Sequence, residues 1–307
     1  MTIPFADSLF NPVGLSTGLF IDKLSGIGGI PKGYITELWG RSGTGKSTVA
    51  LQMAASFQRQ GLRCLWVDSE WSYAPLYADK LGVDNTKMGL YRDTFAENIL
   101  DTIEDVITTD DGKKKGDWDI IFLDSIGGLL ARSEAEKRSG EIVIAAQGKL
   151  LAPWLKKVAP KLALHGVSLV VINHAKQDLM SGTWQPSAGE KLIFHKGFSI
   201  YLKQDGGFKK GEDRIGDLIV AEVKKNKVAA TKGQKYISHF IYGKGISWAL
   251  DLVRDGMDEE IIVKKGNTLY FGDIKLGVGQ HKSSEVLEED ADITERIKHA
   301  LKGTENT

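Results

Sequence analysis

Hydrophobic runs and amphipathic stretches alternate along the first two thirds of the chain. Mostly apolar runs predict strands at residues 34–40, 62–68, 119–124 and 167–173. Apolar residues at helical spacing predict intervening helices at residues 47–60, 96–108 and 149–164. The last of these is interrupted at Pro153 and Pro160. Because strands that are apolar on both faces are typical of covered parallel sheets, the pattern predicts an α/β fold with a mostly parallel sheet flanked by helices.

The pattern changes in the last third of the chain. Shorter segments predict antiparallel edge strands at residues 198–203, 217–222 and 235–242. From about Leu250 the pattern indicates a short acidic helix, a hairpin at residues 261–275 and a final helix at 292–301. We interpret the chain as a short N-terminal arm (1–12), a core (13–249) and a small α+β C-terminal subdomain with its tail (250–307).

Two stretches, residues 133–148 and 177–196, have little periodicity and are predicted to be loops. The second contains Gly182, Pro186 and Gly189. Loops of this length are uncommon inside a compact fold and are usually functional or disordered. We therefore expect each to be either functional or disordered.

Composition narrows the classes of protein that fit. The 307 residues include 40 basic and 40 acidic ones, so the formal net charge is zero and any nucleic-acid site must be a local patch. A single cysteine, Cys64, excludes an internal disulfide and a multi-cysteine metal site. No apolar run approaches the roughly 18 residues of a membrane span, and no secretory signal begins the chain. We expect a cytoplasmic protein without a membrane partner.

A phosphate-binding motif follows the first predicted strand and precedes a helix. Its residues, read as G-x-x-x-x-G-K-[ST], and the next threonine are the predicted nucleotide-binding set: Gly40, Arg41, Ser42, Gly43, Thr44, Gly45, Lys46, Ser47 and Thr48. Glycines let successive backbone N–H groups point at an anion, and the helix N-terminus adds a partial positive charge. Lys46 would neutralise the β- and γ-phosphates, and the Ser47 hydroxyl would bind Mg²⁺. The predicted cofactors are ATP and Mg²⁺.

Two carboxylates are candidates for the chemistry at this motif. Asp124 ends a buried strand, where it can hold Mg²⁺ through water, although a helix N-cap is the alternative. Glu70 lies 24 residues after Lys46, at the end of the second predicted strand. A general base at this position is physically sensible, with a solvated loop acid as the alternative.

Several ordered motifs resemble the RecA strand-exchange recombinases and their phage relatives such as UvsX. The motifs begin at residues 16, 26, 40, 68, 75, 122, 171, 223 and 242, and include Asp68-Ser-Glu70, Phe122-Leu-Asp-Ser125 and Tyr242-Gly-Lys-Gly-Ile-Ser247. The resemblance extends from about Val13 to Lys302, nearly the whole chain. The run from Asp124 and the Asn173–His174 pair are more similar to the phage branch. The resemblance implies a RecA-like P-loop NTPase core.

The resemblance also implies roles for individual residues. Glu70 matches the catalytic glutamate of the family, and Tyr77 matches an aromatic ring that stacks on adenine, although Tyr77 can also be a core tyrosine. Lys225 and Lys227 match lysines that reach the γ-phosphate on the neighbouring subunit. His174 stands where cellular members have a glutamine that senses the γ-phosphate and couples it to the second DNA loop.

Residues 133–148 and 177–196 match the two DNA-binding loops of the family. Candidate phosphate contacts are Lys149, Lys156, Lys176, Lys191 and Lys196. Trp184 is a candidate for base stacking, and Ile142 and Ile144 could act as apolar wedges between bases. The alternative is an ordinary solvated lysine face, with Trp184 packed in a subdomain interface.

The resemblance implies a DNA-dependent ATPase that forms filaments on single-stranded DNA and catalyses homologous pairing and strand exchange. Expected partners are single- and double-stranded DNA, further copies of the chain, and single-strand-binding and loader proteins. Two rival hypotheses are a hexameric helicase or translocase, and an ATP-gated recombination mediator without strand exchange. The expected location is the bacterial cytoplasm, or the host cytoplasm if a phage encodes the protein.

Overall fold

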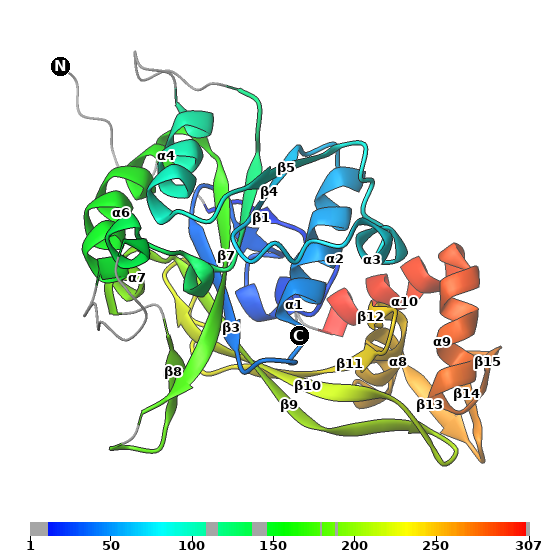
Figure 1. Ribbon diagram of the computed structural model, residues 1–307. Coiled ribbons are helices and arrows are strands. Elements are labelled where there is room, and N and C mark those ends of the chain that lie inside the picture. The colour runs from blue at the N-terminus through cyan, green and yellow to red at the C-terminus, as the bar shows by residue number, and fades with distance from the viewer. Residues whose placement is uncertain (1–11, 109–115, 137–145, 179, 188–189, 305–307) are drawn as a thin grey trace.

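The computed structural model describes residues 12–108, 116–136, 146–178, 180–187 and 190–304. A ten-stranded sheet runs through the core in the order β12-β11-β10-β9-β3-β7-β6-β4-β5, and β8 pairs with β7 (Figure 1). The strands are β3 (Ile35–Gly40), β4 (Cys64–Asp68), β5 (Met88–Arg92), β6 (Ile120–Asp124), β7 (Ser168–Gln177), β8 (Trp184–Pro186), β9 (Phe198–Lys210), β10 (Asp213–Asn226), β11 (Lys235–Ile241) and β12 (Gly245–Ile246). Strands β9, β3, β7, β6, β4 and β5 are parallel. The mostly parallel sheet is therefore confirmed.

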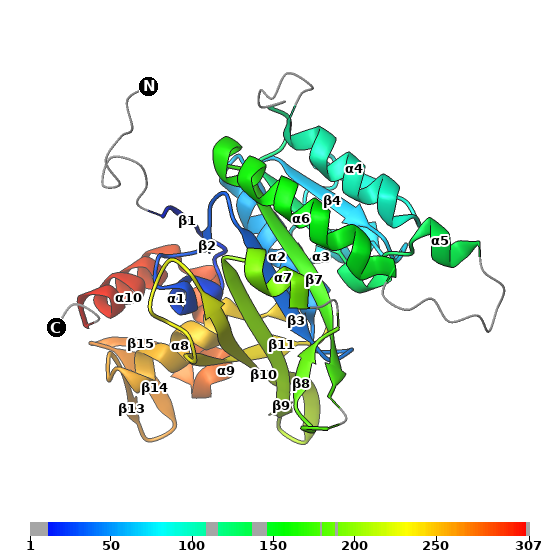
Figure 2. The ribbon, with the colours of Figure 1, turned by 90° about the vertical axis from the view of Figure 1, so that its left-hand side faces the viewer.

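Helices cover both faces of the sheet. One face packs against α1 (Ile21–Ser25), α2 (Lys46–Arg59) and α3 (Pro75–Lys80), which form one hydrophobic cluster with it. The other face packs against α4 (Ala96–Ile107), α6 (Ala146–His165) and α7 (Glu190–His195). Figure 2 shows α4 and α6 lying side by side on this face. The short elements β1 (Gly14–Leu15), β2 (Ile30–Pro31), η2 (Ile126–Gly128) and α5 (Arg132–Ala135) complete the core.

The last part of the chain has a hydrophobic cluster of its own. It consists of α8 (Trp248–Asp258), β13 (Ile262–Lys265), β14 (Thr268–Phe271), β15 (Ile274–Val278), α9 (Gly279–Glu289) and α10 (Ala291–Thr304). Leu269, Leu276 and Leu287 are buried at its centre. The Asp251 carboxylate in α8 accepts hydrogen bonds from the Ser238 hydroxyl and the His239 backbone of β11, which joins this part to the core sheet.

Several sequence predictions need correction. Helix α6 continues through Pro153 and Pro160, because its apolar face is buried and Trp154 Nε1 donates to the Leu100 carbonyl (2.9 Å). This burial offsets the backbone hydrogen bonds that proline cannot donate. None of the three predicted edge strands is at an edge: β9 pairs with β3 and β10, β10 pairs with β9 and β11, and β11 pairs with β10 and β12. The sequence analysis also missed β5, β15 and α9, the first two because each is only five residues long and the last because it has few apolar residues.

The two predicted loops are partly regular. Residues 133–135 belong to α5 and 146–148 to α6, while Ile142 and Ile144 lie outside the described residues. In the second stretch, β8 forms a hairpin with β7 through the pairs Ala175–Pro186 and Gln177–Trp184. Helix α7 follows this hairpin. The prediction of a plain loop at 177–196 is therefore wrong, because backbone pairing orders a sequence that has no hydrophobic period. Of the predicted N-terminal arm, only Pro12 is described.

Candidate functional site: a phosphate-binding loop and the carboxylates beside it

The phosphate-binding loop connects the buried strand β3 to helix α2. Gly43 and Gly45 both have φ of +78°, in the left-handed region that glycine adopts without strain. A Cβ on Gly40 would lie 2.3 Å from the Leu202 carbonyl oxygen, so a larger residue would push the loop off β9. The glycines are therefore required by backbone geometry, and the first turn of α2 is left with N–H groups available to an anion.

The Lys46 side chain folds over this loop. Its Nζ donates to the carbonyl oxygens of Gly40 (3.1 Å) and Arg41 (2.8 Å). Burial lowers the pKa of Lys46, an effect that Asp124 and Glu70 oppose. A cation held here on carbonyl oxygens can move to phosphate oxygens without leaving the loop.

Asp124 ends β6 beside Asp68 of β4. Burial raises the pKa of Asp124 to about 6, although a side-chain hydrogen bond from Ser47 opposes the shift. The Ser47 hydroxyl and the Asp124 carboxylate are thus adjacent oxygen donors, the kind of ligand that Mg²⁺ takes together with substrate phosphates and water. The described residues contain no group of three or more His, Cys, Asp or Glu side chains suited to a metal. The donors fit a nucleotide-bound Mg²⁺ rather than an all-protein metal site.

Asp68 has a structural role. It is fully buried, its carboxylate accepts from the backbone N–H groups of Ser72 and Tyr73 (3.0 Å each), and it pairs with Arg92 (3.0 Å). These contacts anchor the turn that carries Glu70 out from the end of β4.

Glu70 lies between two polar partners. Its Oε1 accepts from the Ser125 hydroxyl and lies 3.0 Å from His174 Nε2. Burial acts to raise the pKa of Glu70, but the hydrogen bonds from Ser125 and His174 and the charge of Lys46 hold it below its ordinary value. Glu70 is therefore ionised at neutral pH and able to accept a proton. Sequence reasoning missed Ser125, whose place directly after Asp124 is the signal that could have found it.

His174 connects the phosphate-binding loop to the β7–β8 hairpin. It stands directly beside Gly40 in the register of β7 and β3, and the hairpin pairs begin at the next residue, Ala175. A shift of His174 would therefore act on both Glu70 and the predicted DNA-binding segment.

Tyr77 belongs to α3 and lies against the start of α2. Its hydroxyl is 2.9 Å from Thr48 Oγ1, and its half-buried ring packs against the core cluster. A core contact is therefore present, and the exposed part of the ring remains available for stacking.

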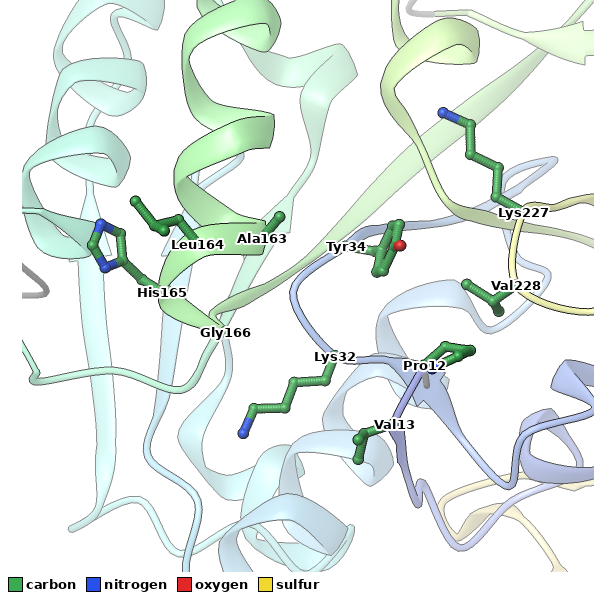
Figure 3. A pocket seen from close by; sticks show the side chains of 10 residues that line it. All are labelled: Pro12, Val13, Lys32, Tyr34, Ala163, Leu164, His165, Gly166, Lys227 and Val228. Atoms are coloured by element: carbon green, nitrogen blue, oxygen red, sulfur yellow. The ribbon is translucent and has the colours of Figure 1, made fainter. Parts of the chain in front are cut away.

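Lys225 and Lys227 lie at one end of the strands of the sheet, and the phosphate-binding loop lies at the other end. Asn226, which lies between them, pairs with Phe198 of β9, and Phe198 pairs with Thr36 near the start of β3. The phosphate-binding loop begins at Gly40, at the other end of β3. Four residues of strand separate Thr36 from Gly40, about 13 Å at the usual rise. Figure 3 shows Lys227 at a cavity of about 610 Å³, which Tyr34 and Leu164 also line. Both lysines therefore lie far from the loop of their own chain, and Lys227 Nζ donates to the Phe194 carbonyl (3.0 Å).

The described DNA-binding candidates fall into different settings. Lys149, Lys156 and Lys176 are exposed. Burial is the largest cause that lowers the pKa of His195, and the positive charges of Lys227, Lys156 and Lys225 lower it further. For Lys191 the structure describes the backbone in α7 but not the side chain.

Lys196 is a correction to the predicted DNA contacts. Its side chain is 5% exposed and forms an ion pair with Glu37, whose side chain is fully buried. Glu37 also accepts from Asn173 Nδ2 (3.0 Å) and the Ser199 hydroxyl (2.7 Å). Because a buried carboxylate needs such partners, Lys196 serves the interior of the sheet and does not face DNA.

Trp184 stands over the phosphate-binding loop. The Arg41 guanidinium carbon lies 4.8 Å from the centre of the indole ring, within the range of a cation–π contact. The second predicted DNA-binding segment thus touches the nucleotide-binding loop through a side chain from each.

Comparisons with known proteins show the family of the chain. The RecA N-terminal domain family model matches residues 11–247. RecA of Sulfurovum sp. (strain NBC37-1) is 32% identical over 96% of this chain and 85% of its own length. RecA of Wolinella succinogenes is also 32% identical, over 94% of this chain and 82% of its own length. The crystal structure of the RadB recombinase shares the fold, with a TM-score of 0.55 at 23% identity over 76% of this chain and 98% of RadB.

Within the described residues, no helix is both long and apolar enough to cross a membrane. The RecA N-terminal domain model matches most of the chain, and the similarity to bacterial RecA proteins is nearly full-length, in agreement with the ordered motifs of the sequence. The chain belongs to the RecA family of recombinases.

Proposed function

We propose that the protein is a DNA-dependent ATPase that forms filaments on single-stranded DNA and catalyses homologous pairing and strand exchange. The observation that carries this proposal is the ionised Glu70, held by Ser125 and His174 beside a complete phosphate-binding loop. A protein that only bound nucleotide would not need a carboxylate poised to accept a proton there. This argues against the alternative of a mediator without turnover.

The proposed hydrolysis uses the residues of the loop in separate roles. Backbone N–H groups of residues 40–47 and the Lys46 ammonium hold the phosphates of ATP, and the Tyr77 ring stacks on adenine. Ser47 and Asp124 would hold Mg²⁺, which when bound neutralises phosphate charge. Glu70 orients the attacking water and accepts its proton.

His174 is proposed to couple the two binding events. His174 contacts Glu70, which lies beside the phosphate-binding loop. Its strand, β7, continues directly into the hairpin that carries Lys176 and Trp184. DNA bound at the hairpin would hold His174 and Glu70 in one arrangement, so single-stranded DNA would stimulate hydrolysis.

Lys225 and Lys227 are proposed to act on the ATP of a neighbouring copy. They lie at the ends of the strands opposite the loop, so only a head-to-tail contact between two copies can bring them to the triphosphate of a neighbour. The exposed side chains of Val13 and Leu164 line the cavity beside Lys227 and would be covered by the same neighbour. Charge supplied between subunits makes hydrolysis depend on filament assembly, as an arginine finger in trans does.

The finer predictions are proposed on the same basis. DNA phosphates would meet Lys149 and Lys176, and Trp184 would stack on bases. Double-stranded DNA would enter during pairing, and single-strand-binding and loader proteins would assist assembly. We expect the protein in the cytoplasm of a bacterium, or of the host if a phage encodes it.

Two measurements test the proposed function. ATP turnover should rise when single-stranded DNA is added, and Lys46→Ala should abolish it. Negative-stain microscopy with single-stranded DNA and a non-hydrolysable ATP analogue should show helical filaments. Closed rings would favour the helicase alternative, and turnover that ignores DNA would contradict the proposal.

A further inference from the structure

A second pocket, of about 580 Å³, adjoins the phosphate-binding loop. Its lining includes Trp39, Arg41, Trp184, Tyr201, Lys203 and Lys224. Among the described residues that line it there is no carboxylate, and none of Lys46, Ser47, Glu70 and Asp124 belongs to it. Ser42 and Thr44 of the phosphate-binding loop also line this pocket, here called the Tyr201 pocket. The pocket therefore adjoins the triphosphate site but contains none of the side chains assigned to the γ-phosphate or to Mg²⁺.

Aromatic rings and cations alternate in the Tyr201 pocket. The rings of Trp39 and Tyr201 are 4.3 Å apart, and Lys224 Nζ lies 5.5 Å from the centre of the Tyr201 ring. The Arg41 guanidinium likewise lies over the ring of Trp184, which also lines the pocket. Flat apolar faces beside positive charges fit a nucleobase and the phosphate attached to it.

The cations are only weakly engaged by the protein. Lys224 Nζ donates to Glu222 Oε1 (2.6 Å), and Lys203 lies 3.8 Å from Asp205. The side chain of Lys224 is 39% exposed and that of Lys203 is 58% exposed. Because exposed pairs of this kind contribute little free energy, a phosphate can replace the carboxylates at small cost.

We propose that the Tyr201 pocket binds one nucleotide unit, with its base against the Tyr201 and Trp184 rings and its phosphate on Lys203 and Lys224. This proposal rests on the proposed function, because Trp184 is carried by the predicted DNA-binding hairpin. The same chemistry could come from a DNA strand or from a free nucleotide. We favour the DNA strand, because the β7–β8 hairpin forms one wall of the pocket.

The first test measures DNA affinity against salt. Binding of a fluorescent oligo-dT to the K203A/K224A double variant should weaken at least tenfold relative to the unchanged protein. The slope of log affinity against log salt should fall by about 0.7 for each phosphate that the variant no longer neutralises. The control is K264A, an exposed lysine of β13 in the separate C-terminal sheet, which should keep both the affinity and the slope.

Free nucleotide is tested by equilibrium dialysis with a non-hydrolysable ATP analogue and no DNA. Two bound analogues per chain, falling to one in K203A/K224A, would support the pocket with free nucleotide as its source. A loss of oligo-dT affinity with one analogue per chain would support the DNA strand. If neither quantity changes while the unchanged protein binds DNA, the pocket proposal is overturned and the proposed function stands. Failure of the unchanged protein to bind DNA would instead contradict the proposed function.

Discussion

Substitution of Lys196, which pairs with Glu37, can distinguish a structural role for this lysine from a role in DNA binding. Both side chains are almost completely buried, and Glu37 keeps two further hydrogen bonds from Asn173 and Ser199. Replacing Lys196 with methionine keeps most of its apolar volume but leaves the carboxylate without its counter-charge. Loss of one partner of a buried pair costs roughly 3–5 kcal/mol.

This magnitude sets the size of the expected change in melting temperature. Unfolding entropy of about 2.1 cal/mol/K per residue implies that each kcal/mol lowers Tm by roughly 1.6 °C in a chain of this length. Lys196→Met should therefore lower Tm by about 5–8 °C. The double variant Glu37→Met/Lys196→Met removes both charges and should recover most of the loss, because no unpaired buried charge remains.

The assay combines thermal unfolding with oligo-dT binding at a temperature where each variant is folded. Lys156→Ala is the control, since Lys156 is exposed and its removal should leave Tm unchanged. If Lys196→Met kept its Tm but lost DNA affinity, the structural reasoning would be refuted and Lys196 would return to the DNA-binding set. Failure of the double variant to regain stability would show that the charge is not the cause.

Three further predictions concern the nucleotide site. Glu70→Gln should reduce ATP turnover about 10²–10⁴-fold while ATP binding persists, as radiolabelled-nucleotide binding would show; normal turnover would exclude Glu70 as the base. Asp124 has a raised pKa of about 6, so the folded protein holds its proton more tightly than the unfolded chain, and stability falls as pH rises from about 4 through about 6. Asp124→Asn removes that penalty and should raise the Tm of the nucleotide-free protein at pH 7.5 while abolishing Mg²⁺-dependent hydrolysis; a lower Tm would contradict the burial argument. Finally, His174→Ala removes a contact that lowers the pKa of Glu70, so the acidic limb of the ATPase pH profile should move to higher pH, and an unmoved limb would show that Ser125 and Lys46 suffice.

Much of the nucleotide site could be predicted from the sequence because its parts are local. The loop at residues 40–47 is contiguous, and its glycines are required by φ angles and by the nearness of β9. Asp124 and Glu70 follow strand ends, and parallel strands bring such ends to the same edge of the sheet. Spacing alone was sufficient to place them near the loop.

Contacts between distant segments could not be predicted in the same way. Lys196 and Glu37 are 159 residues apart, and only the packing of α7 against the sheet shows that this lysine is buried. The contact of Arg41 with Trp184 depends on the β7–β8 hairpin, whose residues show no hydrophobic period. The presence of a lysine in a sequence does not show whether its side chain will face solvent or the interior of the protein.

The sequence by itself determined the parallel α/β core, the phosphate-binding loop and the carboxylates beside it, because backbone geometry and strand polarity depend on neighbouring residues. The tertiary structure alone decided which cations face solvent, which rings meet the loop, and that Lys225 and Lys227 lie opposite their own nucleotide site. These features depend on free energies of burial and pairing, which are set only when segments far apart in the chain come into contact.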